Sequence, residues 1–204
     1  LIEGVAILRH LWGEKCVTHQ GKYYHFTDVE LLPKPIQQPL PIFIAASPRG
    51  HWTDEDRVLR RISKHADGWQ TAGNPVETFR RRFETIKEYT TQQGRDPSKF
   101  ESCIHMMVNI NDSTEAAFND AIAFVTKYYG PGHPSQERPG PWLAHGPPEA
   151  VAEKLREYIN AGCTTPVLRF VSTDLRGQLQ RCIEEVFPLL PEVERQEPAA
   201  RPVA

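Results

Sequence analysis

Short apolar segments alternate with amphipathic helical segments through most of this 204-residue chain, and this alternation constrains its fold more than any other feature. We expect strands at 41–46, 67–71, 100–110 and 165–171, each followed by at least one helix. A strand–helix–strand order lets successive strands run parallel while the helix crosses back over the sheet. The pattern therefore predicts an α/β fold with parallel strands and helical crossovers, either half of an eight-stranded barrel or a small open sheet.

The helices are indicated by apolar residues that recur three or four positions apart. We expect Thr53 to cap the helix after the first strand, because acidic residues follow it in the first turn. Asp112 and Glu115 have the spacing of a capping box and should open the helix after the third strand. Residues 130–141 are rich in glycine and proline and are expected to lack regular structure.

The composition is that of an ordinary globular domain, with 39% hydrophobic and 25% charged residues. We expect residues 1–190 to form one domain and residues 191–204 to form a disordered tail. The net charge of −2 gives no electrostatic reason to expect nucleic acid or a membrane surface as a partner. The four cysteines are far apart and the eight histidines form no HExxH pattern. We therefore expect reduced thiols in a cytoplasmic protein and no metal site.

The segment Pro41–Gly50, PIFIAASPRG, runs from bulky apolar residues into small ones and ends in a Pro–Arg–Gly turn. A strand that ends in small residues lets a ligand come close to the backbone and its free N–H groups. With the hydroxyl of Ser47, the guanidinium of Arg49 and a helix start nearby, the segment favours an anion cradle, most naturally for a phosphate. The alternative is a strand-to-helix loop that holds no ligand.

Several motifs resemble, in the same order, the C-terminal part of the bacterial luciferase-like flavin monooxygenase and coenzyme F420-dependent oxidoreductase superfamily. They reach to about Pro191 and are ILRHLWGE, GKYYHF, LLPKPIQQPLPIFIAAS, HADGWQT, GRDPSKF, GPPEAVAEKLREYINAGC and EEVFPLLP. Each motif is weak alone, and their shared order carries the resemblance. It implies the C-terminal half of a (β/α)8 TIM barrel, with the cofactor at the C-terminal ends of the strands. It also implies that the first four strand–helix units are absent from this chain.

The resemblance further implies where the cofactor phosphate binds. In the family, the segment after the matching strand helps to hold that phosphate, which agrees with the anion cradle inferred from the residues. Carried over position by position, Ala46, Ser47, Arg49 and Gly50 become cofactor-binding candidates. Many members have two glycines where this chain has Ala45 and Ala46, so a methyl group narrows the approach to the phosphate here.

Other side chains have both a functional and a structural interpretation. Trp69 either walls the cofactor or substrate cavity, as a cofactor-binding residue, or packs against the next helix. One face of the third strand is expected to face the barrel interior and consists of Cys103, His105, Met107 and Asn109. His105 is expected to be structural, and Arg169 is expected to form an ion pair inside the barrel rather than to contact substrate. The catalytic residues are unknown, since the resemblance places them in the first half of the barrel.

We predict an oxidoreductase in which the cofactor carries the chemistry and the protein orients the substrate. The first form is a luciferase-like monooxygenase, a flavoprotein that uses reduced FMN and O2 on a small organic substrate. The alternative is F420-dependent hydride transfer, and an alternative of another class is a non-catalytic half-barrel or interaction subunit. The expected partners are a small-molecule substrate and a flavin or deazaflavin, with no nucleic acid and no membrane. The open sheet edges of a half-barrel also favour a homo-oligomer.

Overall fold

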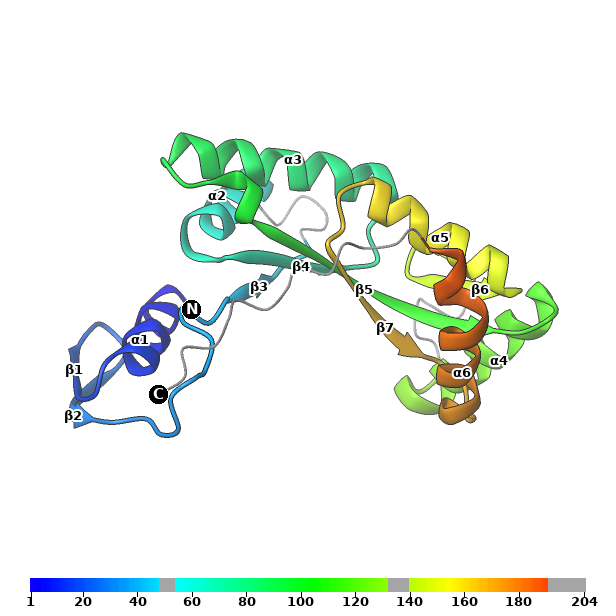
Figure 1. Cartoon of the computed structure of the whole chain (residues 1–204), viewed down its shortest axis with the longest axis horizontal. Helices are drawn as coiled ribbons and strands as arrows, with labels where there is room; N and C mark the ends of the chain where they lie inside the picture. Colours follow the sequence, from blue (N-terminus) through cyan, green and yellow to red (C-terminus); the bar gives the residue numbers. More distant parts are fainter. Residues whose placement is uncertain (48–53, 132–139, 191–204) are drawn as a thin grey trace. The chain divides into compact units, whose positions relative to one another are not determined.

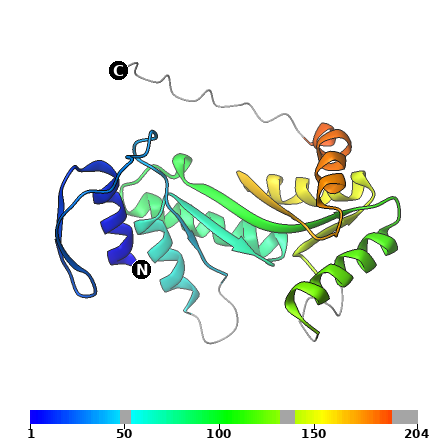
Figure 2. The same ribbon diagram turned by 90° about the horizontal axis from the view of Figure 1, so that it is seen from below.

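The structure, a computed structural model, describes residues 1–47, 54–131 and 140–190 (Figure 1). By its contacts the chain divides into two compact units, Leu1–His105 with Ala161–Val167 and Met106–Asn160 with Leu168–Ala204. The strand β5 (Glu101–Ile110), the long green strand of Figure 2, contributes its first part to one unit and its second part to the other. The prediction of one domain over 1–190 stays a prediction.

The first unit combines a small antiparallel sheet with parallel strands and their crossover helices. It contains α1 (Ile2–Gly13), β1 (Val17–Gln20), β2 (His25–Val29), β3 (Phe43–Ala45), α2 (Glu55–His65), β4 (Gly68–Ala72), α3 (Val76–Gln92) and the 3-10 helix η1 (Pro97–Lys99). β1 and β2 pair antiparallel, whereas β3 pairs parallel with β4, and β4 pairs parallel with β5. β3 and β4 therefore bring their carboxyl ends to the same edge of the sheet, where Ala72 at the end of β4 pairs with His105 in the middle of β5.

The second unit repeats the alternation. It contains the end of β5, α4 (Thr114–Tyr129), β6 (Leu143–Gly146), α5 (Pro148–Asn160), the end of β7 (Thr165–Phe170), α6 (Leu175–Arg181), the π-helical turn η3 (Cys182–Val186) and the 3-10 turn η4 (Phe187–Leu189). β6 pairs parallel with the end of β5, and β7 also pairs with β5. The predicted α/β class with parallel strands and helical crossovers is confirmed.

The core of the first unit lies between the parallel strands and the apolar faces of α2 and α3. Ile62 of α2, Phe79 and Ile86 of α3 and Trp69 of β4 are each 0% exposed. α3 ends before Gly94, whose positive φ of 73° suits a residue without a Cβ. These contacts hold the carboxyl end of β4 in place.

Two details of the helix and strand predictions are wrong. Ser113, and not the Asp112–Glu115 capping box, caps α4, because the Ser113 hydroxyl lies one residue before the helix and accepts a hydrogen bond from the Ala116 N–H. The strand β6 was not predicted at all, since four residues give too short a pattern and depend on pairing with β5. At α2 the observed cap is Asp54, whose side chain accepts from the Arg57 N–H, while the predicted cap Thr53 lies outside the described residues.

Within the described ranges, no helix is long and apolar enough to cross a membrane. The same residues contain no group of three or more His, Cys, Asp or Glu side chains that could hold a metal ion.

Candidate cofactor site

A pocket of about 280 Å³ lies at the carboxyl ends of β3 and β4. Its lining residues are Ala45, Ala46, Ser47, Gln70, Thr71, Ala72 and His105. The carboxyl ends of parallel strands are where α/β folds bind their ligands, because loops rather than strand pairing follow there. The small side chains of Ala45, at the end of β3, and of Ala46, just after it, leave room for a ligand against the backbone at this edge.

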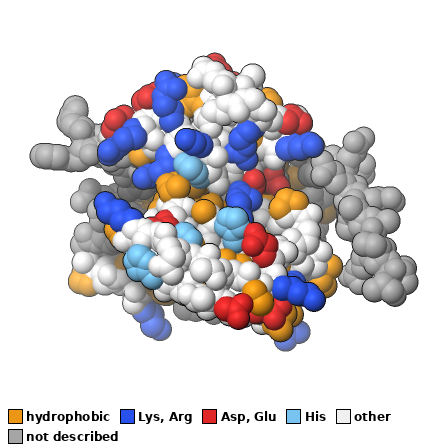
Figure 3. All heavy atoms as spheres, turned by 90° about the vertical axis from the view of Figure 1, so that its left-hand side faces the viewer, with side chains coloured by type: hydrophobic (Ala, Val, Ile, Leu, Met, Phe, Trp, Pro, Cys, Tyr) orange, Lys and Arg blue, Asp and Glu red, His pale blue; other side chains and the backbone are white. Residues whose placement is uncertain are grey.

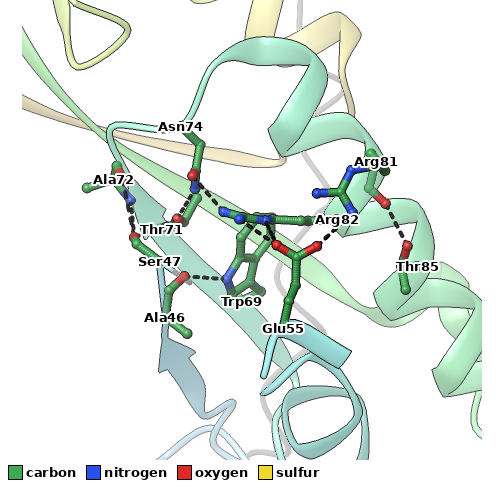
Figure 4. Close-up of polar contacts among 10 residues, drawn as sticks. All are labelled: Ala46, Ser47, Glu55, Trp69, Thr71, Ala72, Asn74, Arg81, Arg82 and Thr85. Atoms are coloured by element: carbon green, nitrogen blue, oxygen red, sulfur yellow. Dashed lines mark hydrogen bonds and ion pairs between the residues drawn. The ribbon is translucent and has the colours of Figure 1, made fainter. Parts of the chain in front are cut away.

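The Ser47 hydroxyl is the central polar group of the pocket (Figure 4). Its Oγ lies 2.8 Å from Thr71 Oγ1, accepts a hydrogen bond from the Ala72 N–H at 3.2 Å and lies 3.3 Å from the Ala72 carbonyl oxygen. A hydroxyl has one proton to donate and two lone pairs. Thr71 and Ala72 therefore hold the Ser47 hydroxyl in position. If Thr71 donates its proton to Ser47 Oγ, the Ser47 proton has, among the described residues, only the long 3.3 Å contact with the Ala72 carbonyl oxygen.

A chain of polar side chains continues from Ser47 toward α3. Asn74 donates from Nδ2 to Thr71 Oγ1, and Arg82 Nη1 donates to Asn74 Oδ1 at 2.7 Å. Thr71, Asn74 and Arg82 are 3%, 5% and 7% exposed, so this chain is buried. Buried polar groups need hydrogen-bond partners, and here each side chain is the hydrogen-bond partner of the next one in the series.

Glu55 at the start of α2 balances the positive charge that Arg82 brings to this series of polar side chains. It accepts from Arg81 Nη1 at 2.7 Å, and from Arg82 Nη2 and Nε at 2.6 and 2.9 Å (Figure 4). The hydrogen bond from Arg81, followed by that from Arg82, holds the pKa of Glu55 below its ordinary value. The pair Glu55 and Arg82 thus joins the beginning of α2 to α3, and the bond from Arg82 to Asn74 extends this link to the loop after β4.

Trp69 is buried in the packing between β4 and α3. Its ring stacks on Phe79 with centroids 5.2 Å apart, and its Nε1 donates to the Ala46 carbonyl at 2.9 Å. It is not among the residues that line the pocket described above, and its hydrogen bond to the Ala46 carbonyl is its described contact with the site. Its role as a cofactor-binding wall stays a prediction.

The structure brings the predicted residues Ala46 and Ser47 together at the pocket, with one change for Ala46. The Ala46 N–H donates to the Gln70 carbonyl at 2.9 Å and is therefore not free for a ligand. Ala46 contributes its small side chain to the lining instead. Arg49 and Gly50 lie outside the described residues, and their roles stay predictions.

Several residues of the site were missed by sequence reasoning, namely Thr71, Asn74 and Arg82. Thr71 and Asn74 stand at and just after the end of a parallel strand, the same signal that singled out Ser47. His105 was expected to be structural, yet it is half-buried and lines the pocket. Arg82 gave no signal, because its run of three arginines on α3 looks like an exposed charged face.

The second half of β5 differs from expectation. We expected Met107 and Asn109 to face the barrel interior, but Met107 packs on the cluster that includes Ala121 of α4. Asn109 Nδ2 donates to Asp120 of α4 and to the Val171 carbonyl, both at 2.8 Å. Strand alternation showed which side chains share a face of β5 but not that α4 covers that face.

The predicted ion pair of Arg169 is also wrong, as none is found for it among the described residues. Its Nη1 donates to the Tyr129 hydroxyl at 2.6 Å, and its guanidinium lies 4.3 Å from the ring centroid of Tyr128. Arginine pairs well with tyrosine rings because the face of the ring is negative. Arg169 thus holds the end of α4.

A cluster of cationic side chains marks the opposite, amino ends of β3 and β4. Asp67 Oδ2 accepts from the Ile42 N–H at 2.9 Å and from Arg9 Nη2 at 2.8 Å, and Asp67 Oδ1 accepts from Arg95 at 3.3 Å. Burial, together with the neighbouring cations, lowers the pKa of His65. Figure 3 shows Lys and Arg side chains gathered in a band across the upper half of one face of the chain. The Asp67 ion pairs tie strand starts and helices together, away from the pocket at the carboxyl ends.

The family model described as luciferase-like monooxygenase matches residues 1–165. The chain belongs to the luciferase-like monooxygenase family. Among curated proteins, the chain is 22% identical over 209 residues to an F420-dependent glucose-6-phosphate dehydrogenase of Kineococcus radiotolerans, covering 93% of this chain and 60% of that protein. It is 24% identical over 213 residues to the same-named enzyme of Beutenbergia cavernae, covering 95% and 61%.

Solved structures of the luciferase-like family share the fold of this chain. An F420-dependent secondary alcohol dehydrogenase in complex with an F420–acetone adduct superposes with a TM-score of 0.75 at 18% identity, over 94% of this chain and 61% of that one. The monooxygenase RslO1 of Streptomyces bottropensis gives a TM-score of 0.69 at 17% identity, over 91% and 59%. These likenesses confirm the prediction that the chain forms part of a (β/α)8 barrel. The chain spans about 60% of the length of the curated relatives it matches.

Proposed function

We propose that the protein carrying this chain is an oxidoreductase that binds coenzyme F420 and transfers a hydride between this cofactor and a small organic substrate. The observation that carries the proposal is the pocket at the carboxyl ends of β3 and β4, where the Ser47 hydroxyl has a weakly engaged proton. The named functions of the curated relatives, which are F420-dependent dehydrogenases, support the choice of F420.

The residues of the pocket fit the phosphate-bearing part of such a cofactor. Ala45 and Ala46 are small enough to let the cofactor lie near the strand end, and Ser47 supplies a hydrogen-bond donor. When bound, a deazaflavin supplies the hydride chemistry itself. The chain contributes the position of the phosphate and the wall formed by Gln70, Thr71 and His105.

A second candidate function is oxygenation of a small organic substrate with reduced FMN and O2, which the sequence pattern placed first. The name of the family and structural neighbours such as the long-chain alkane monooxygenase LadA, with a TM-score of 0.59 and 20% identity, favour it. We rank it second because the curated relatives with detectable sequence similarity carry F420-dependent names. The substrate, a homo-oligomeric state and a cytoplasmic location stay predictions.

The test is a binding titration of the protein produced from its full reading frame. F420 and FMN are titrated by fluorescence, each beside its phosphate-free counterpart, which is riboflavin for FMN. We expect tighter binding of F420 than of FMN, and hydride transfer without O2. Tighter FMN binding with O2 consumption would instead favour the monooxygenase, and no binding of either cofactor would favour a non-catalytic interaction subunit.

Arg49 and Gly50 enter the same titration as candidates that rest on the sequence alone. Loss of one charge-assisted contact costs about 1.5–3 kcal/mol, so we expect Arg49→Ala to weaken the phosphorylated cofactor about 10- to 150-fold. Equal weakening of FMN and riboflavin would show that Arg49 does not contact the phosphate.

A further inference from the structure

We propose that Arg82 is a positioning residue for the cofactor phosphate: through Asn74 and Thr71 it orders the hydroxyl protons, so that Ser47 turns its own proton toward an anion in the pocket. The inference rests on the proposed function and goes beyond it, since it assigns the direction of each hydrogen bond in the buried chain. Figure 4 shows these side chains as one connected line from α3 to the end of β3.

The first step fixes the orientation of the Asn74 amide. A guanidinium has donors only, so the Asn74 atom that lies 2.7 Å from Arg82 Nη1 must be the oxygen Oδ1. The amide nitrogen Nδ2 then faces Thr71 and donates to its Oγ1. Arg82 itself is held by Glu55, with Nη2 and Oε2 separated by 2.6 Å.

The second step fixes the Thr71 proton. Thr71 Oγ1 already accepts from Asn74, and Ser47 Oγ at 2.8 Å is the acceptor that the described contacts offer to its proton. Thr71 is only 3% exposed, so a proton turned away from Ser47 would be buried without a partner, which costs about 1–3 kcal/mol. Thr71 therefore donates to Ser47.

The third step leaves one group for the ligand. Ser47 Oγ accepts from both Thr71 and the Ala72 N–H, so both of its lone pairs are used. Within the described part of the chain, its own proton has only the Ala72 carbonyl oxygen at 3.3 Å, longer than the usual hydroxyl hydrogen bond of about 2.5–3.0 Å. A phosphate oxygen in the pocket can accept a shorter, charge-assisted hydrogen bond, so the Ser47 hydroxyl donates to it instead of to the Ala72 carbonyl. The positive charge of Arg82 polarises each hydrogen bond of this series of side chains, so that every proton points away from Arg82 and toward the pocket.

The decisive variant is Asn74→Asp, which has nearly the same shape but reverses the order. The new carboxylate accepts from Arg82 as before, yet it cannot donate to Thr71. The Thr71 proton then turns to the carboxylate, and the Ser47 proton turns to Thr71. In this background Ser47 has no proton left for the phosphate.

The measurement is a double-mutant cycle on the phosphate contribution, defined as the affinity for FMN relative to riboflavin and, in parallel, for F420 relative to the deazaflavin without its phosphate. In the wild-type background we expect Ser47→Ala to lower this ratio about fivefold, equivalent to about 1 kcal/mol. In the Asn74→Asp background we expect Ser47→Ala to change it less than twofold. Because each comparison is made within one background, the added negative charge cancels.

Thr71→Ser is the matched control, since it keeps the hydroxyl and the proton order, and there Ser47→Ala should again cost about fivefold. If Asn74→Asp does not fold, as judged by circular dichroism, Arg82→Met replaces it. The Asn74 oxygen then loses the Arg82 donor that fixes the orientation of the amide, and Ser47→Ala should cost less than the fivefold expected in the wild type. An equal cost of Ser47→Ala in the wild-type and Asn74→Asp backgrounds would overturn the inference, as would no cost in the wild type. Those outcomes leave the proposed function intact as long as F420 binds more tightly than FMN. Failure of the wild type to bind either cofactor would overturn both.

Discussion

Arg81 and Arg82 both bond to Glu55 but differ in what else they hold, so replacing each by methionine separates a buried network from a surface ion pair. The Arg81 side chain is 58% exposed and contacts Glu55 through one nitrogen. The Arg82 side chain is 8% exposed and also bonds to Asn74. Methionine preserves the long apolar stem of each arginine and its helix propensity, so the comparison isolates the guanidinium.

The expected magnitudes follow from these contacts. A hydrogen bond to a charged partner contributes about 1.5–3 kcal/mol, and we take the low end for Arg82–Glu55 because Glu55 is 31% exposed and keeps Arg81. The Arg82–Asn74 bond adds about 1 kcal/mol, so Arg82→Met should lower the free energy of unfolding by about 2.5–3 kcal/mol. Arg81→Met should lower it by about 0.2–1 kcal/mol, as for other exposed ion pairs.

The assay is urea unfolding followed by far-ultraviolet circular dichroism. With a slope of about 2 kcal/mol per molar urea, Arg82→Met should move the midpoint down by about 1.2–1.5 M and Arg81→Met by no more than about 0.5 M. Equal shifts for the two variants would refute the claim that the buried chain from Arg82 to Ser47 stabilises this part of the protein.

Other contacts give further expected outcomes. The two arginine partners hold the pKa of Glu55 below its ordinary value of 4.5. The stability difference between wild type and Glu55→Gln should therefore be full at neutral pH and decrease as the pH falls below 4.5 through the lowered pKa of the folded state, measured by thermal unfolding across pH. Gly162→Ala should lower the free energy of unfolding in urea by about 2–3 kcal/mol, since φ is +98° and the new Cβ would lie 3.1 Å from the Phe83 ring. Gly94→Ala, with φ +73° but open space around the new Cβ, should lower it by about 1 kcal/mol. Equal losses for the two variants would show that the contact with Phe83 costs nothing. Cys16 is exposed and the other three cysteines are buried, so a thiol reagent should modify one cysteine in the folded protein and four after unfolding.

Part of the candidate site could be predicted because the residues at the end of β3 that line it are adjacent in the sequence. The change from Ile44 to Ala45, Ala46 and Ser47 is visible in sequence, and small residues at the end of a parallel strand indicate a ligand edge. The same rule applied to β4 would have found Thr71, which lies near the carboxyl end of another parallel strand. Arg82 could not be found in this way, since its partner Asn74 is fixed by how α3 folds back over β4.

Sequence alone determined the alternation of strands and helices, the parallel α/β class and the position of Ser47 at a strand end, because these depend on periodicity and on residues next to one another. Tertiary structure decided that β6 forms, that α4 covers Met107 and Asn109, and that Arg169 pairs with tyrosines rather than with a carboxylate. Each of these depends on which distant group lies opposite a side chain. Periodicity identifies the face that a residue belongs to, but only the folded chain determines what that face meets.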